Sequence, residues 1–157
     1  MTEQISGQAV GGEQFLTFTI GAEEYGIEIL KVQEIKGYSA ITPIPNAPHY
    51  VRGVINLRGT IIPVIDLRAR FGMSEEAYTE FTVIIVVNLG RRVVGLVVDA
   101  VSDVLNVGEQ DVEPPPPLGV GVDTGFMTGL AKMGERLVLL LNIEQVANLE
   151  ESVLQTA

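Results

Sequence analysis

The alternation of apolar and polar positions along the chain predicts short β-strands almost throughout. Residues 15–20 and 25–29 alternate with a period of two, the pattern of a strand with one buried face. Residues 82–89 and 137–141 are nearly continuous apolar runs, as in strands buried on both faces. Glycines and prolines separate these runs, and an irregular connection is predicted at residues 38–50. The pattern therefore indicates an all-β protein.

Residues 51–71 carry the strongest local pattern, which predicts a strand, a tight turn, a second strand and a short helical turn. Gly59 suits the left-handed conformation that such a turn often needs. Asp66 is placed to cap the helical turn, and Gly72 is placed to end it. Pro63 lacks a backbone donor, so the second strand is predicted to lie at a sheet edge or to be bulged there.

Arg58 stands in the turn of this hairpin. A guanidinium held beside a turn can grip a carboxylate with two hydrogen bonds. The alternative is an arginine that is simply solvated.

An internal repeat organises the rest of the chain. Residues 15–35 match the chain about 69 positions later, and residues 53–67 match it about 76 positions later. The first shift places Gly26 on Gly95 and Glu34 on Asp103, and the second places Gly53 on Gly129 and Asp66 on Asn142. Two copies of a strand-rich unit with tight turns predict two small antiparallel barrels. An amphipathic helix is predicted at residues 142–154.

Composition narrows the setting of the protein. The formal net charge of −10 argues against nucleic acid and against anionic membrane surfaces as partners. The absence of cysteine excludes disulfides and thiolate chemistry, so a reducing compartment is expected. No apolar run approaches the roughly 20 residues that cross a bilayer, and the polar start does not resemble a secretory signal. We therefore expect a cytoplasmic protein.

The sequence evidence for catalytic groups is weak. Residues 123–125 match the short Asp-Thr-Gly signature of aspartic proteases, but without a companion segment. The glycines of residues 119–129 lack the Gly-Lys-Ser/Thr of a phosphate-binding loop. His49 is the only histidine and lies between a proline and a tyrosine. Asp66, Asp99 and Asp103 stand on separate elements, where capping and solvation explain them. We expect no enzyme, no cofactor and no metal.

Several motifs together resemble the CheW family of bacterial chemotaxis coupling proteins. They are Asn-Leu-Arg-Gly at residues 56–59, Pro-Val-Ile-Asp-Leu-Arg at 63–68, the run at 24–35, the run at 92–105 and Asn-Ile-Glu at 142–144. In order, they span residues 13–150.

The resemblance implies a fold of two SH3-like, five-stranded antiparallel barrels packed together. A short helix would follow the first barrel's hairpin, and another helix would lie at the C-terminus. Residues 1–12 are expected to be disordered, and residues 13–157 to form a single domain. Its lobes would divide near residue 80, and whether they exchange strands stays open.

The resemblance also implies a function, that of an adaptor without catalysis. Such proteins join the histidine kinase CheA, through its regulatory domain, to the cytoplasmic tips of methyl-accepting chemoreceptors. The alternative is a CheW-like scaffold of another receptor–kinase array, serving surface motility or gene regulation. A barrel-fold enzyme is a distant third hypothesis, which the search above disfavours. As an adaptor, the protein would be cytoplasmic and recruited to membrane-associated chemoreceptor arrays.

By position, the resemblance assigns Glu34 and Arg58 as a charged pair beside the receptor groove. Four further positions match receptor or kinase coupling in the family: Val32, Gly53, Ile84 and Gly95. For Val32 and Ile84, plain core packing is an equal alternative. Arg58 is expected to matter more for signalling than for folding.

A proline-rich stretch at residues 113–118 is the last candidate. It is predicted to be a stiff polyproline II segment, and Glu113, Pro116 and Leu118 are candidate contacts with the kinase ring. The alternative is a rigid spacer.

Overall fold

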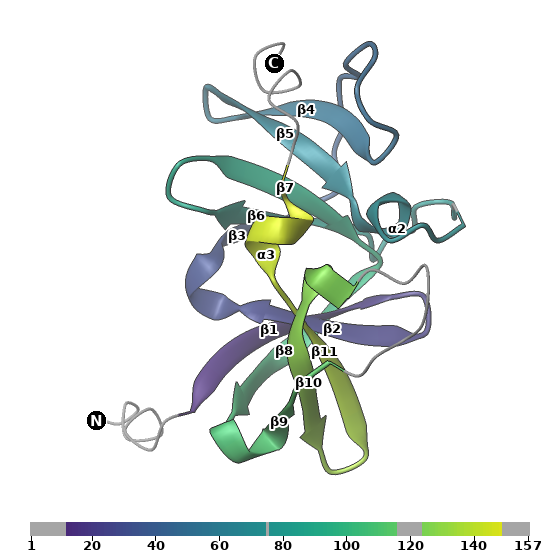
Figure 1. The fold of residues 1–157 in the computed structure, drawn as a ribbon. Coiled ribbons are helices and arrows are strands. Elements are labelled where there is room, and N and C mark those ends of the chain that lie inside the picture. Colours follow the sequence, from purple (N-terminus) through teal and green to yellow (C-terminus); the bar gives the residue numbers. More distant parts are fainter. Residues whose placement is uncertain (1–11, 75, 116–123, 149–157) are drawn as a thin grey trace.

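The computed structural model describes residues 12–74, 76–115 and 124–148 (Figure 1). The disorder expected for residues 1–12 therefore lies outside the described residues, apart from Gly12. Within the described ranges the chain is mostly β-strand, with two short α-helices. This confirms the predicted all-β class. No helix among the described residues is long and apolar enough to span a membrane.

The outer sheet is built from both ends of the described chain. Its strands lie in the order β8-β1-β2-β11-β10-β9. Their bounds are β1 Glu13–Ile20, β2 Glu23–Glu28, β8 Ala100–Val107, β9 Val112–Glu113, β10 Met127–Met133 and β11 Arg136–Leu141. The first hairpin, β1 with β2, thus pairs with β8 along one edge and with β11 along the other. Both strands lie more than 70 residues later in the sequence.

The inner sheet comes from the middle of the chain. Its strands lie in the order β3-β6-β7-β5-β4. Their bounds are β3 Val32–Gly37, β4 Val51–Leu57, β5 Thr60–Asp66, β6 Val83–Asn88 and β7 Val93–Val98. A bridge from Thr42 to Val54 joins the segment after β3 to β4, so the sheet curls into a barrel. In Figure 1 the two sheets lie one above the other.

The sheets do not divide at residue 80, so the expected lobe boundary is wrong. The inner sheet uses residues 32–98 only, and the outer sheet uses what lies before and after them. The reason is strand pairing, because β1 and β2 join β8 and β11 instead of β3 to β5. In the sequence, the strands of the inner barrel therefore lie between β2 and β8 of the outer barrel.

The internal repeat is visible strand by strand. Shifting the first unit by the two offsets places β1, β2 and β3 on β6, β7 and β8, and β4, β5 and α2 on β10, β11 and α3. The sheet orders correspond in the same way, with β8-β1-β2-β11-β10 against β3-β6-β7-β5-β4. Each barrel therefore combines strands from both units.

Two details differ from five antiparallel strands in each barrel. The outer sheet gains the two-residue strand β9, which pairs with β10. Each sheet also contains one parallel pair, β2 with β11 and β5 with β7. A tight turn between consecutive strands forces them to pair antiparallel. The two parallel pairs join strands from different units, which no tight turn connects, so they can be parallel.

Three clusters of buried side chains hold the fold together. The largest lies between the sheets and includes Phe18, Tyr25, Leu67 and Leu96. The second fills the inner barrel, and the third fills the outer barrel. Since the central cluster takes residues from both sheets, the two barrels share one core.

The hairpin of residues 51–71 forms as predicted, with α2 at Leu67–Arg70. The Asp66 carboxylate accepts hydrogen bonds from the backbone N–H groups of Arg68 and Ala69, which confirms the cap. However, β5 is an interior strand, so the edge position expected from Pro63 is wrong. Val54 exchanges both its backbone hydrogen bonds with Thr42, and pairing with β7 begins only at Val64, so no donor is needed at Pro63.

The C-terminal part is described only to residue 148. The helix α3 spans Ile143–Val146 and is capped by the Asn142 side chain. It ends at Ala147, so the predicted helix over residues 142–154 is wrong at residues 147 and 148, and residues 149–154 lie outside the described residues. The glycine-rich stretch at residues 119–129 is described only from residue 124 onward. A 3-10 turn occupies Thr124–Phe126, and β10 begins at Met127 because Leu141 pairs there.

Candidate functional site

Glu34 and Arg58 form an ion pair on the surface of the inner barrel. The guanidinium donates two hydrogen bonds to the carboxylate, at 2.5 Å and 3.4 Å. The Arg58 side chain is 69% exposed, although its partner is largely covered. The hydrogen bond from Arg58 lowers the pKa of Glu34 below its usual value, and the same contact raises the pKa of Arg58. The pair ties the β4–β5 turn to the edge strand β3.

The turn holds Arg58 in an unusual backbone conformation. Its φ is 50° and that of Gly59 is 92°, so both central residues of the two-residue loop are left-handed. Such a turn suits the twist of a hairpin but favours asparagine, aspartate or glycine. The Asn56 side chain supports it by accepting a hydrogen bond from the Gly59 N–H at 2.7 Å. Arginine at this position is therefore unexplained by the turn itself.

The other four assigned positions lie on strands β3, β4, β6 and β7 of the inner barrel. Val32 is half-buried and packs against the central cluster. Ile84 and Gly95 are buried in the inner barrel and touch, because a Cβ on Gly95 would come within 2.8 Å of the Ile84 side chain. Gly53 has a φ of 145°, and a Cβ there would lie 2.0 Å from the Thr42 carbonyl oxygen. The structure thus brings only Glu34 and Arg58 to the surface as a contacting pair.

The proline-rich candidate is only partly described. Glu113 is exposed at the end of β9, with its carboxylate 3.7 Å from the Lys132 ammonium. Pro116 and Leu118 lie outside the described residues.

The outer barrel has a similar acid–arginine pair that sequence reasoning missed, although the repeat relates only the two acids, Glu34 and Asp103. Asp103 stands on β8 where Glu34 stands on β3, and Arg136 at the start of β11 donates to it at 3.0 Å. Arg136 also binds Glu24, and Asp103 accepts a hydrogen bond from the Thr17 hydroxyl. The repeat offset alone placed Asp103 on Glu34, and that was the available signal.

The two ion pairs are flanked by matching apolar side chains. Ile35 beside Glu34 is 43% exposed, and its counterpart Val104 is 47% exposed. Ile61 after the Arg58 turn is 50% exposed, and its counterpart Leu137 is 49% exposed. Both barrels therefore present an acid–arginine pair with exposed apolar neighbours, which is a chemistry suited to protein partners.

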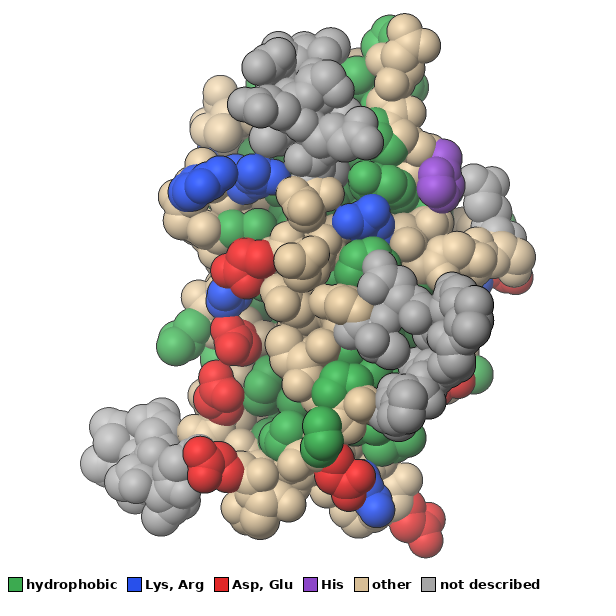
Figure 2. Space-filling view, viewed as in Figure 1, with side chains coloured by type: hydrophobic (Ala, Val, Ile, Leu, Met, Phe, Trp, Pro, Cys, Tyr) green, Lys and Arg blue, Asp and Glu red, His purple; other side chains and the backbone are tan. Residues whose placement is uncertain are grey.

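A groove of about 300 Å³ lies between the start of β1 and the 3-10 turn Ile29–Lys31. Ile29 and Leu30 line it, and Leu30 is almost fully exposed, two residues before β3 begins at Val32. Acidic side chains form a row along one side of the molecule in Figure 2. Apolar walls with an acidic margin can accept an amphipathic element of a partner.

The described residues hold no group of three or more histidine, cysteine, aspartate or glutamate side chains arranged for a metal ion. His49 places one ring nitrogen 3.2 Å from the Ala69 carbonyl oxygen, so it packs in the loop before β4. Asp99 pairs with Arg68, and Asp66 caps α2.

Comparison with known proteins agrees with this arrangement. The chemotaxis protein CheW of Klebsiella aerogenes is 50% identical over 151 residues, covering 96% of this chain and 90% of that protein. The chemotaxis protein CheW of Rhizobium meliloti is 40% identical, covering 96% and 97%.

A solved structure has the same fold. The scaffolding protein TtCheW from Thermoanaerobacter tengcongensis superposes with a TM-score of 0.81 at 36% identity, covering 88% of this chain and 94% of that one. The CheW-like domain profile matches residues 14–151. The chain therefore belongs to the CheW-like domain family and is a non-catalytic scaffold of chemotaxis signalling.

Proposed function

We propose that this protein couples the cytoplasmic tips of chemoreceptors to the regulatory domain of a CheA-type histidine kinase, so that ligand occupancy of the receptors controls kinase activity. In this proposal it acts in the cytoplasm and is recruited to membrane-associated receptor arrays. Relatives that carry the name chemotaxis protein CheW over nearly the whole chain support this function over an array for another purpose.

The observation that carries the proposal is the Glu34–Arg58 pair. An arginine in a left-handed turn costs stability, and two hydrogen bonds hold its side chain over β3. Fixed charges beside exposed apolar side chains give a partner both orientation and contact area. We assign Glu34 and Arg58 to the rim of the receptor groove.

The remaining positions are part of the inner barrel that carries this rim. Val32 follows the exposed Leu30 and packs into the central cluster, so it links the groove to the core between the barrels. Gly53 lets the Thr42 segment close the inner barrel, and Gly95 makes room for Ile84. Changes at the three interior positions Gly53, Ile84 and Gly95 would act by moving the surface, not by removing a contact with a partner.

A reconstituted signalling complex tests the proposal. Purified protein is mixed with a CheA-type kinase and a receptor cytoplasmic fragment, and both co-sedimentation and kinase phosphorylation are measured. Arg58→Ala should weaken receptor-dependent kinase activation by about fivefold to tenfold, with thermal unfolding close to wild type. Arg58→Lys keeps the charge but loses the two-point grip, so it should fall between them.

Arg91→Ala serves as the matched control, because Arg91 is an exposed arginine in the neighbouring β6–β7 turn. It should behave as wild type. Wild-type protein that binds neither kinase nor receptor fragment would contradict the coupling function. An Arg58→Ala variant that activates the kinase fully, or that simply unfolds, would contradict the site.

A further inference from the structure

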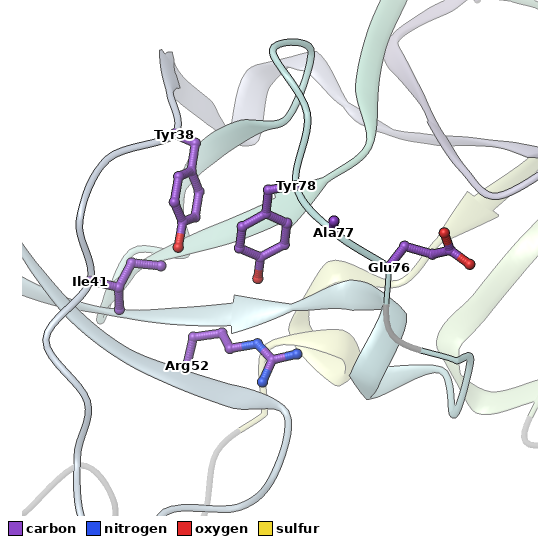
Figure 3. Close-up of a pocket in the computed structure, with 6 residues that line it drawn as sticks. All are labelled: Tyr38, Ile41, Arg52, Glu76, Ala77 and Tyr78. Carbon is purple, nitrogen blue, oxygen red and sulfur yellow. The ribbon is translucent and has the colours of Figure 1, made fainter.

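The segment that joins α2 to β6 lies beside two hollows of the inner barrel. The first has a volume of about 370 Å³ and is lined by Tyr38, Ile41, Arg52, Glu76, Ala77 and Tyr78 (Figure 3). The second has a volume of about 130 Å³, and Glu76, Ala77 and Thr79 of the same segment line it. Residues 76–79 therefore have space beside them, and they lack the dispersion contacts that fix a closely packed segment.

Both ends of this segment are held to the barrel. At its start, the Arg68 guanidinium donates a hydrogen bond to the Ser74 carbonyl oxygen at 3.2 Å, and Arg68 is itself paired with Asp99. The hydrogen bond to Asp99 raises the pKa of Arg68, and the charge of Glu76 acts in the same direction. In Figure 3 the Glu76 carboxylate points away from the two tyrosine rings. At the other end, Thr82 is buried directly before β6.

The middle of the segment is joined to the barrel through Tyr78. The Tyr78 hydroxyl donates a hydrogen bond to Asp66 Oδ2 at 2.7 Å. Its ring lies 4.5 Å from the Tyr38 ring at an angle of 54°, and Figure 3 shows the two rings side by side. One side chain thus supplies both a hydrogen bond to a buried carboxylate and an aromatic contact.

The residues after Tyr78 are exposed and bonded to one another. The Thr79 N–H donates to Thr82 Oγ1 at 2.8 Å, and the Phe81 N–H donates to Thr79 Oγ1 at 3.0 Å. Phe81 is 64% exposed. Hydrogen bonds of this kind shape the end of the segment but do not tie it to the strands below, and such regions open at low free energy.

Asp66 can release Tyr78 without becoming an unpaired buried charge. It is the one buried carboxylate among the residues that the structure describes. It also accepts hydrogen bonds from Arg52 Nε at 3.1 Å and from the Arg68 N–H at 2.9 Å. These bonds join parts of β4, β5 and α2, so they remain when Tyr78 leaves and the carboxylate keeps its cationic partner.

We propose that residues 76–81 form a strap that opens from the inner barrel as a local unit, with the Tyr78–Asp66 hydrogen bond as its latch. When closed, the strap covers the Asp66 carboxylate. When open, it joins the two hollows into one trough in which Asp66 and Arg52 face solvent, since Glu76 and Ala77 line both hollows. The device does not depend on the receptor-groove assignment.

Native-state proteolysis of the whole chain with endoproteinase Glu-C tests the strap. This protease cleaves after glutamate, and the strap contains Glu76 and Glu80. Mass spectrometry identifies each cut, and the rate of cutting follows the open population when the protease is dilute. In the wild type, cleavage after Glu80 should depend on urea much more weakly than global unfolding does, because local opening exposes little surface.

Substitutions separate the latch from global stability. Tyr78→Phe keeps the ring but loses the hydrogen bond, so it should raise the rate of cleavage after Glu80 about tenfold. Tyr78→Ala also loses the ring contact and should raise the rate further. Tyr38→Phe is the matched control, because it removes a hydroxyl from the same pocket and leaves the bond to Asp66 in place. It should cleave as the wild type does.

Arg70→Ala provides the opposite test. It removes hydrogen bonds to α3 that a protein with an open strap would keep, so it should lower global stability and leave cleavage after Glu80 unchanged.

Three outcomes would overturn the strap. The first is cleavage after Glu80 with the full urea dependence of global unfolding, or cleavage that rises in Arg70→Ala as global stability falls. The second is a Tyr78→Phe protein that is cleaved at the wild-type rate. The third is wild-type protein cleaved as fast as an unfolded peptide of residues 74–84, which would mean that nothing holds the strap closed.

Discussion

Arg58 occupies a backbone conformation that arginine seldom adopts, and its neighbourhood shows why single residues matter in this fold. The turn would accept glycine or asparagine at this position without strain. Gly53 is the opposite case, because its φ of 145° and the Thr42 carbonyl exclude every side chain. Arg58 contributes a charge to the surface, whereas Gly53 allows the barrel to close.

Gly53→Ala should therefore destabilise the protein by about 3 kcal/mol or more, since the added Cβ collides with backbone that cannot move aside. Gly37→Ala is the matched control, because nothing lies within 4 Å of a Cβ at that position. It should change the free energy of unfolding by less than about 0.5 kcal/mol. Urea denaturation measures both. Equal effects of the two substitutions would show that closure at Thr42 is not needed.

At the scale of elements, Arg70 joins the two short helices. It lies at the end of α2, and its guanidinium donates to the carbonyls of Val146 and Gln145 at the end of α3, at 3.0 Å and 3.1 Å. The same group lies over the rings of Tyr50 and Phe126. A cation at a helix C-terminus satisfies carbonyls that have no partner within the helix.

Replacing Arg70 by alanine should lower the free energy of unfolding by about 2 kcal/mol, because both the carbonyl contacts and the ring contacts are lost. Arg70→Lys should recover about half, since lysine keeps the charge but not the planar group that contacts both. Chemical denaturation gives the values, with Arg91→Ala as a surface control. If Arg70→Ala left the free energy of unfolding unchanged, α3 would be held by its apolar face alone.

At the scale of the whole molecule, two ion pairs connect the repeat units with reversed polarity. Arg68 on α2 pairs with Asp99, and Glu144 on α3, the counterpart of Arg68, pairs with Lys31. The first unit carries both cations and the second carries both anions. Two copies of the first unit would set cations beside helices that carry cations, so the charges favour pairing of unlike units.

These contacts predict how stability depends on pH. Burial alone would raise the pKa of Asp99, but hydrogen bonds from Arg68 and from the Gly21 N–H outweigh it and lower the pKa. Hydrogen bonds from Arg136 and Lys31 lower the pKa of Asp103 and of Glu144, respectively. A carboxyl with a lowered folded pKa stabilises the fold above its ordinary value, and that contribution is lost as pH falls through the folded pKa.

The free energy of unfolding should therefore decline as pH falls from about 5 towards 3, near and below the ordinary values of these groups. Asp99→Asn should lose about 1 kcal/mol at pH 7 and show a shallower decline. Urea denaturation at several pH values provides the measurement. An unchanged slope in Asp99→Asn would remove Asp99 from the explanation.

Much of this architecture could be predicted from local patterns. The 51–71 hairpin, its cap at Asp66 and the repeat follow from turn chemistry and apolar periodicity, which act between near neighbours. The position of β5 and the boundary at residue 80 could not be predicted, because both depend on which unit pairs with which. That choice is made by contacts such as Val138 with Glu24, more than 100 residues apart.

Part of the candidate site could also be predicted from the sequence, and part could not. Asn-Leu-Arg-Gly at residues 56–59 directed attention to Arg58, and its bond to Glu34 joins residues 24 apart. The Asp103–Arg136 pair was missed because the repeat placed Asp103 on Glu34 but indicated no partner for it, since the second offset places Arg58 on Gly134 and not on Arg136. The pocket at Tyr38 and Tyr78 was missed as well, since its lining comes from three segments with no shared motif.

The insertion of one barrel into the other sets an order of events during synthesis. The inner barrel needs nothing beyond residue 98, so it can close while the ribosome is still adding β8 to β11. The first hairpin, although made earliest, has no complete sheet to join until β11 emerges near residue 141. We expect the hairpin to pack against the central cluster first, so that the first strands synthesised are the last to complete their strand pairing.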